Sequence, residues 1–388
     1  MKGKVDPAVI LIGLMILGAV VFGVVLVLQL QKDTVSIAAA EDGEFSVLIV
    51  LTNGGALEFS QILTVNPQTH RAALFDIPYN LGLILDSLQR VDRITAVYDE
   101  LGIEAYLTAV RRFFAHPVRF VMEMELRDFR EVTDLLGGIQ VSLGQAIDVN
   151  DDGEIVRIPS GTNVLDGEKI LGLLSFFTSD QSPVDRTDRL FMVLRGFFER
   201  VGSQAELLSR PRAAELLRWR IKENMDERGL QTFVSILAQI DFQRIFTQRV
   251  LGVERTPEGG VPLLFPHSDG QIARDLIKQI SAILQQEVVE GAMLADIRVQ
   301  ILNGTRVNGL ARRTESLLAG YGLQIAEVGN ATSQDVENTQ VVYTDNAEAA
   351  RQVADLLRVK EITQGGATAG SYDVSIILGR DFDGWYVR

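Results

Sequence analysis

The hydrophobic pattern begins with one long apolar stretch, and short apolar runs separated by polar residues follow it. Residues Ala8–Leu30 carry no charge, and Gln29 is their one polar side chain. At about 1.5 Å per residue a helix of this length spans roughly 34 Å, which exceeds the hydrocarbon core of a bilayer at about 30 Å. The pattern therefore predicts an N-terminal transmembrane helix over residues 8–30.

The charges beside this stretch predict its orientation. Lys2 and Lys4 precede it, whereas the residues that follow it soon become acidic. The positive-inside rule then makes residues 1–7 a cytoplasmic tail and places the rest of this single-pass protein outside the cytoplasmic membrane. A cleaved signal peptide is the alternative, with Ala38–Ala40 as the cleavage site. Its apolar region would be only about 7–15 residues long, so the uncleaved anchor is favoured.

Beyond a stalk predicted over residues 31–44, runs with strand character alternate with runs of helical periodicity. In residues 187–201, for example, the apolar side chains recur on one face of a helix. Strands are expected at 45–52, 59–65, 71–77, 119–124 and 139–143, and helices at 93–115, 129–136, 167–175, 187–201 and from 204 to 248. The alternation predicts an α/β domain over residues 45–252, with a sheet covered by helices on both faces.

A linker containing a helix is predicted over residues 253–295, because Pro and Gly cluster in Glu254–Pro266 before helical periodicity resumes. A second, smaller unit is predicted over residues 296–388. Its strands are expected at 297–302, 323–328, 339–344 and 373–379, and its helices at 310–321 and 347–357. This order predicts a small C-terminal α+β domain.

Composition limits the classes of function. The 388 residues carry a net charge of −14, and since residues 1–7 contribute +1, the remainder carries −15. Such an acidic surface repels phosphate backbones, which argues against a nucleic-acid partner. The chain has no Cys, which excludes disulfides and thiolate metal sites. The histidines His70, His116 and His267 lack ligand spacing and are expected at the surface or in loops.

Two segments of the smaller unit are similar to the two ends of a known module. The run VQILNGTRVNGLA, residues 299–311, resembles the opening of the LytR-type C-terminal domain in the LytR-CpsA-Psr family of envelope proteins. The run VSIILGRDF, residues 374–382, resembles its closing strand. The Asn-Gly pair of the first run suits a tight turn after a strand. These residues identify the module and imply no chemistry.

The larger domain resembles the catalytic domain of the same family over about residues 45–250. The similar segments are VLIVLTNGG, RAALFDIPYN, VTDLLGGIQVSL, GTNVLDGEKILGLL and VDRTDRLFMVL. The resemblance implies an α-β-α layered domain that transfers a glycopolymer from a polyprenyl diphosphate to the cell wall. That chemistry needs cations for the diphosphate, acids for Mg²⁺ and an apolar tunnel for the lipid.

This sequence departs from the family at most of the polar positions. Tyr79 and Asn80 replace the Arg and Asp of the Ile-Pro-Arg-Asp segment, and Asn53 and Ser60 replace the two early metal-binding acids. Ser175 and Phe177 replace the Arg-x-Arg pair, and Leu190 replaces the Gln that follows the last two arginines. Arg186 and Arg189 remain in place, as a candidate residual diphosphate-binding pair. Because Asp185 and Asp188 are interleaved with them, ion pairs along a surface helix are the alternative.

The sequence thus predicts no catalytic residue, no metal ligand and no cofactor. It indicates a non-catalytic, membrane-anchored extracytoplasmic envelope protein. Its predicted partners are the membrane, through residues 8–30, and either a polyprenyl-linked or wall glycan or another envelope protein. The alternative is an active Mg²⁺-dependent phosphotransferase that moves glycopolymer from polyprenyl diphosphate to the wall. Acids such as Asp76 or Asp86 would then replace the lost metal ligands.

Overall fold

The structure is a computed structural model that describes residues 33–144, 146–151, 154–175, 183–257, 260–285, 297–307, 309–321, 323–365 and 372–382. The predicted cytoplasmic tail and the predicted transmembrane helix over residues 8–30 lie outside these ranges. Within them, no helix combines the length and the apolar character needed to cross a bilayer.

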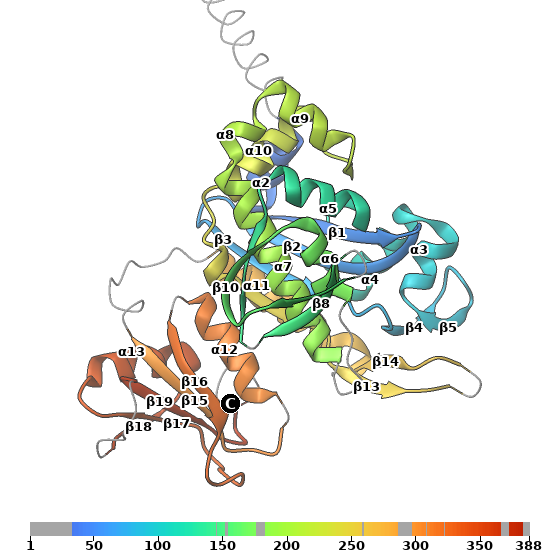
Figure 1. The fold of residues 1–388 in the computed structure, drawn as a ribbon. Coiled ribbons are helices and arrows are strands. Elements are labelled where there is room, and N and C mark those ends of the chain that lie inside the picture. The colour runs from blue at the N-terminus through green and yellow to red at the C-terminus, as the bar shows by residue number, and fades with distance from the viewer. Residues whose placement is uncertain are drawn as a thin grey trace, which may run out of the picture.

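A six-stranded mixed sheet forms the centre of the larger domain (Figure 1), in the order β11-β6-β1-β2-β3-β12. Its strands are β1 (Phe45–Asn53), β2 (Ala56–Asn66), β3 (Arg71–Asp76), β6 (Phe120–Glu125), β11 (Lys222–Glu223) and β12 (Phe246–Arg249). β1, β2 and β3 form an antiparallel meander, whereas β6 and β12 run parallel to β1 and β3. β1 is apolar almost throughout because both of its faces are buried.

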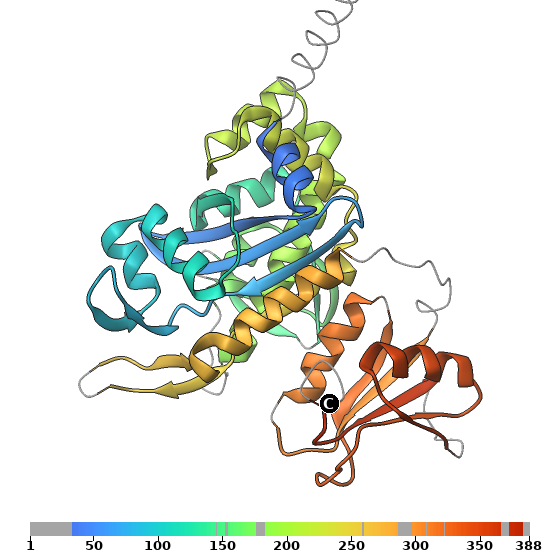
Figure 2. The same cartoon turned by 180° about the vertical axis from the view of Figure 1, so that it is seen from behind.

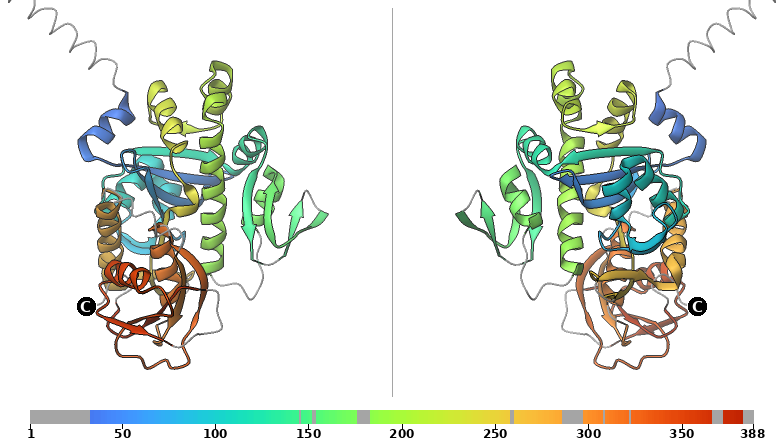
Figure 3. Two further views of the ribbon diagram at one scale, coloured as in Figure 1. Left: turned by 90° about the vertical axis from the view of Figure 1, so that its left-hand side faces the viewer. Right: turned by 90° about the vertical axis from the view of Figure 1, so that its right-hand side faces the viewer.

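Helices cover both faces of this sheet, as the two side views in Figure 3 show. One face is covered by α3 (Thr95–Leu101), α4 (Ile103–Phe114) and α11 (Gln271–Leu284), and the other mainly by α5 (Leu126–Leu135) and α7 (Pro183–Ser203). α6 (Gly167–Ser175) packs on α5, and α10 (Glu227–Leu237) packs on α7. The predicted α/β class is confirmed, since each face of the sheet carries its own hydrophobic cluster.

Residues 31–44, predicted as a stalk, are described from Asp33 onward and instead form helix α2 (Thr34–Asp42). The Asp33 side chain accepts a hydrogen bond from the Ser36 N–H at 2.8 Å and so caps the helix. Val35 is fully buried, and α2 packs against α10. The segment therefore belongs to the folded domain because its small apolar face has a partner that local sequence does not reveal.

Two further segments fold differently from their prediction. Residues 246–249, predicted as the end of a helical region, form β12, because pairing with β3 supplies backbone hydrogen bonds and burial that local propensity does not encode. The predicted linker contains a hairpin of β13 (Gly252–Arg255) and β14 (Leu263–Pro266). A second hairpin, β4 (Gly82–Leu85) and β5 (Arg90–Arg93), was not predicted. A single β-bridge between Leu81 and Leu264 connects the two hairpins.

The C-terminal domain contains a five-stranded sheet in the order β16-β15-β19-β17-β18. Its elements are β15 (Arg298–Asn303), α12 (Leu310–Gly320), β16 (Gln324–Asn330), β17 (Gln340–Tyr343), α13 (Ala347–Leu357), β18 (Glu361–Gln364) and β19 (Val374–Leu378). β18 is exposed along its whole length, so it lacks the alternation of polar and apolar residues that identifies a half-buried strand.

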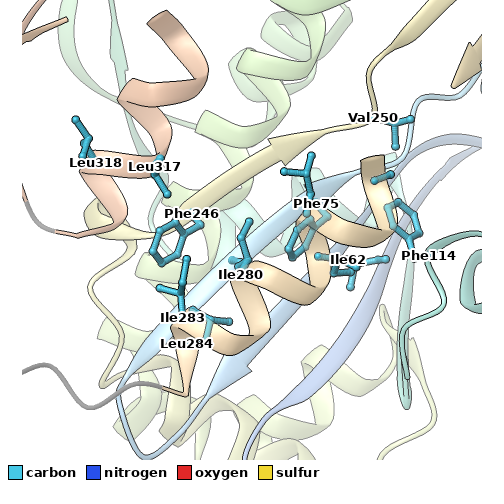
Figure 4. Packing of buried hydrophobic residues seen from close by; sticks show 14 of the residues in the cluster. Ile62, Phe75, Phe114, Phe246, Val250, Ile280, Ile283, Leu284, Leu317 and Leu318 are labelled. Atoms are coloured by element: carbon cyan, nitrogen blue, oxygen red, sulfur yellow. The ribbon is translucent and has the colours of Figure 1, made fainter. Parts of the chain in front are cut away.

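The two domains share one hydrophobic cluster, in which α11 runs across the back of the large sheet (Figure 2). Figure 4 shows Phe246 of β12 between Ile280 and Ile283 of α11 and Leu317 of α12. The Phe246 ring also meets the edge of the Tyr321 ring, with centroids 5.9 Å apart. The helix predicted within the linker is therefore part of the core that joins the two domains.

Candidate functional site

The retained arginine Arg186 lies near the start of α7, where it is enclosed by other side chains. Its guanidinium carbon is 4.4 Å from the centroid of the Phe59 ring and 4.8 Å from that of the Tyr79 ring. The guanidinium also forms an ion pair with the Glu58 carboxylate. Cation–π contacts and a charge-assisted hydrogen bond thus hold Arg186 against β2 and the segment after β3.

A β-bulge explains why Glu58 faces Arg186. Leu51 pairs with Phe59 and Thr52 pairs with Leu57, so Glu58 is an extra residue in β2. A bulge re-aims the side chain that it inserts. The Glu58 carboxylate thereby binds the guanidinium of Arg186, the group to which the family resemblance assigns a diphosphate.

The second retained arginine, Arg189, is 6% exposed and lies one turn further along α7. Asp188, which the sequence places between these arginines, forms an ion pair with Arg249 of β12 at 3.4 Å. Arg186 thus has an acidic partner on another element, Glu58 of β2. The structure brings both arginines to the inner side of α7.

A row of polar side chains crosses the sheet beside these arginines. In the strand register, Gln61 of β2 is opposite Asp76 of β3, and Asp76 is opposite Arg249 of β12. The three residues therefore lie side by side across the sheet. The Asp76 carboxylate accepts hydrogen bonds from the Thr187 hydroxyl at 3.1 Å and from the Gln61 amide at 3.4 Å. The start of α7 and the edge of the sheet thus meet at one buried acid.

Burial raises the pKa of Asp76 to about 6. The hydrogen bonds from Thr187 and Gln61 and the charges of Arg249 and Arg186 act in the opposite direction and keep the pKa from rising further. A buried carboxyl group near two arginines is the kind of acid that the alternative prediction required.

Asp86, the other candidate acid, lies elsewhere. It follows β4, is half exposed and forms an ion pair with Arg112 of α4. The structure therefore brings Asp76 to Arg186 and places Asp86 at the rim of a different cavity. Sequence reasoning named Asp76 without its partners, because Gln61 and Arg249 carry no recognisable motif.

The positions that correspond to the family's metal-binding acids do not fit a magnesium ion. Ser60 is buried, and its hydroxyl shares a hydrogen bond of 2.7 Å with the Tyr106 hydroxyl inside the core. Asn53 is exposed at the end of the β1–β2 hairpin. Both lack a carboxylate, and hard divalent cations favour oxygen ligands that include carboxylates. Among the described residues, no group of three or more His, Asp and Glu side chains is arranged to hold a metal ion.

Among the other replaced positions, Asn80 has a structural partner. Asn80 is buried, and its amide donates to the Glu254 carboxylate at 3.5 Å. Ser175 is the last residue of α6, and Phe177 lies outside the described residues. His116 lies in the loop after α4, one of its two predicted settings, but it is buried: its Nε2 lies 2.7 Å from the Ser46 hydroxyl, and burial lowers its pKa to about 4.

An apolar cavity of about 540 Å³ lies between the β4–β5 hairpin, α4 and β14. Leu83, Ile84 and Val91 of the hairpin, Phe113 of α4 and Phe265 of β14 contribute much of its apolar lining. Such a volume and lining are typical of pockets for apolar ligands. Within the described part of the chain neither retained arginine lines it, so the cavity and the Arg186 region are separate.

Comparison with known proteins identifies both domains. The model of the LytR_cpsA_psr family matches residues 60–269, more than half of the chain, and that of LytR_C, the LytR cell envelope-related transcriptional attenuator, matches residues 296–382. The polyisoprenyl-teichoic acid–peptidoglycan teichoic acid transferase TagU of Bacillus subtilis strain 168 is 25% identical over 176 residues. That match covers 44% of this chain and 56% of TagU, so the chain spans about half the length of this curated relative.

Solved structures share the fold of the larger domain. The crystal structure of B. subtilis TagV superposes with a TM-score of 0.56 at 18% identity and covers 62% of this chain and 98% of TagV. The structure described as TagT bound to LI-WTA has a TM-score of 0.52 at 18% identity and covers 64% of this chain and 92% of TagT.

Proposed function

Because this chain belongs to the LytR-CpsA-Psr family, we propose that it is an envelope protein that binds a polyisoprenyl-linked glycopolymer without transferring it. The curated relatives are named as polyisoprenyl-teichoic acid–peptidoglycan teichoic acid transferases, and they suggest the class of ligand. The predicted anchor at residues 8–30 would hold the protein where such lipids lie.

The ion pair between Arg186 and Glu58 is the observation that carries the non-catalytic part of this proposal. A diphosphate would have to compete with the Glu58 carboxylate for the N–H groups of Arg186, whose guanidinium also contacts two aromatic rings. Each charge-assisted contact contributes roughly 1.5–3 kcal/mol, so an internal acid competes strongly with a ligand. The replaced acids at Asn53 and Ser60 also leave the family's metal position without carboxylates.

The apolar cavity supports the binding part of the proposal. It presents the exposed side chains of Ile84 and Val91 together with buried Leu85 and Phe113. An isoprenoid chain that covers this surface would be stabilised by roughly 25 cal/mol for each Å² of apolar area removed from water. The cavity thus offers the lipid portion of the ligand a site that does not require Arg186.

We expect the full chain in detergent micelles to bind polyprenyl diphosphate with an affinity that Mg²⁺ changes less than about twofold, since no metal contact is involved. Ile84→Asp should weaken binding at least about tenfold, because it places a charge on the apolar wall. The matched control is Ile155→Asp on β9 (Glu154–Ile158), outside the cavity; Ile84 and Ile155 are 80% and 73% exposed. Isothermal titration calorimetry measures both.

Absence of binding by the wild-type chain, or equal weakening by the two variants, would overturn the lipid-binding proposal and favour a protein partner for the C-terminal domain. Polymer transfer in the presence of Mg²⁺ would overturn the non-catalytic part. The buried acid Asp76, beside Arg186 and Arg249, favours this second candidate function. Loss of Mg²⁺-dependent binding and transfer in Asp76→Asn and in Arg186→Ala/Arg189→Ala would then identify the relocated site.

A further inference from the structure

A second large cavity, of about 460 Å³, lies at the junction of the two domains. Arg249 and Leu251, at the end of β12 and just after it, form its wall in the larger domain. The start of α12 and the end of β16 form the wall in the C-terminal domain. Neither the family resemblance nor the Arg186 region accounts for this cavity.

Three arginines from two domains line this cavity in an otherwise acidic protein: Arg249, Arg312 and Arg313. Within the part of the chain that the structure describes, Arg249 Nη1 and Arg313 Nε are buried atoms without a hydrogen-bond partner. Buried polar groups of native proteins are normally hydrogen-bonded, so such atoms indicate a missing acceptor. Burial lowers the pKa of Arg313, and the nearby charge of Arg249 lowers it further.

The helix end that opens into the cavity adds to this preference for an acceptor. α12 begins after Gly309, which has a φ of 75° and supplies no side chain to cap the helix. Gly309, Ala311 and Arg312 all line the cavity. Backbone N–H groups at a helix start favour anions, and guanidinium groups bind the oxygens of phosphate in pairs.

The neighbouring acids lie outside the wall of this cavity. Asp188 forms an ion pair with Arg249 at 3.4 Å, and Asp76 is the neighbour of Arg249 on β3. Glu315 lies further along α12, where burial raises its pKa. Within the described part of the chain no acidic side chain lines the cavity itself. An anion would therefore meet three cations and a helix start without facing a carboxylate in the cavity wall.

We propose that this cavity at the domain junction binds a phosphate group. The ligand would join Arg249 of the larger domain to Arg313 of the C-terminal domain and so stabilise their contact. Two sources share this chemistry, a small phosphate ion and a phosphodiester of an anionic glycopolymer. The inference does not rest on the proposed function, because the apolar cavity and this cavity share no lining residue.

The test titrates the full chain in detergent micelles, at low salt, with inorganic diphosphate in one arm and a glycerol phosphate oligomer in the other. We expect at least one arm to bind, and Arg313→Gln to weaken that binding about tenfold or more, as the loss of one charge-assisted contact does. Arg312→Gln, at an exposed side chain, is the second variant. Arg351→Gln on α13, which removes an equal charge from an exposed ion pair, should bind like the wild type.

Binding of diphosphate alone would identify a small-ion site, and binding of the oligomer would identify a glycopolymer site. No binding in either arm would overturn the proposal. So would wild-type affinity in both Arg313→Gln and Arg312→Gln, or an equal loss in Arg351→Gln. Failure of this test leaves the polyprenyl diphosphate titration unaffected, because that titration uses Ile84 in the other cavity.

Discussion

Phe246→Ala is expected to lower the free energy of unfolding by about 3–5 kcal/mol, the usual cost of removing a fully buried aromatic ring. The ring is 1% exposed and lies between α11 and α12. It also contacts the Arg71 guanidinium, whose carbon is 5.6 Å from its centroid, and the Tyr321 ring. Its loss would leave a cavity at the point where the two domains share their core.

The expected consequence extends to both domains. Arg71 Nη1 donates to the Ile283 carbonyl at 3.0 Å and so helps to end α11, which places Phe246 and the end of α11 in one packed unit. Hydrogen exchange should therefore rise in α11 and in α12, and urea denaturation should give the change in free energy. Trp219→Ala, at a side chain that is 81% exposed, is the control and should change stability by less than about 0.5 kcal/mol. A loss below about 1 kcal/mol in Phe246→Ala would show that the domains are not joined through this ring.

Asp76→Asn is expected to change the pH dependence of stability by about 3 kcal/mol. Burial raises the pKa of Asp76 to about 6 from an ordinary value of 3.8. The folded state therefore binds this proton more tightly than the unfolded state. The stabilisation is fully present below about pH 3.8 and is lost as the pH rises through 6. The folded and unfolded pKa values of Asp76 differ by about two, and each pKa unit corresponds to about 1.4 kcal/mol of stability, which gives about 3 kcal/mol.

The measurement compares the unfolding free energies of the wild type and Asp76→Asn between pH 4 and pH 7.5. The variant should gain roughly 2–3 kcal/mol relative to the wild type over this range, because asparagine stays neutral and most of the titration lies between these pH values. Asp86→Asn, the same change at an exposed side chain, should differ from the wild type by less than about 0.5 kcal/mol throughout. A constant difference between Asp76→Asn and the wild type would contradict the raised pKa and weaken the case for Asp76 as a relocated acid.

Local patterns were sufficient for most of the elements that hold the candidate site. The apolar stripe of residues 187–201 and the helical run over 93–115 predict helices that the structure contains as α7 and as α3 and α4. The helical spacing of the apolar residues in α13 also predicts Ala347–Leu357. By contrast, β12 and α2 were missed because each depends on a partner distant in sequence. β12 pairs with β3, and α2 packs on α10.

Sequence reasoning could identify the arginines of the candidate site but not the residues that they contact. Arg186 and Arg189 could be found because they stand in a family segment, and the loss of acids at Asn53 and Ser60 could be found in the same way. The role of Arg186 could not, since its partner Glu58 is 128 positions away and faces it through a β-bulge. No spacing rule along the sequence predicts where a β-bulge will form or which helix its side chain will face.

The sequence by itself determined the family, the two folded domains and the replacement of the family's polar residues, because these reside in periodicity, turn chemistry and motifs along the chain. The tertiary structure alone decided which charges meet. It brings Asp76 to Arg186, Glu58 to the same guanidinium, and Arg249 to Arg313 across the domain junction. The physical reason is that burial and electrostatic interaction depend on distances in space, and these arise only when the sheet, α7 and α12 pack together.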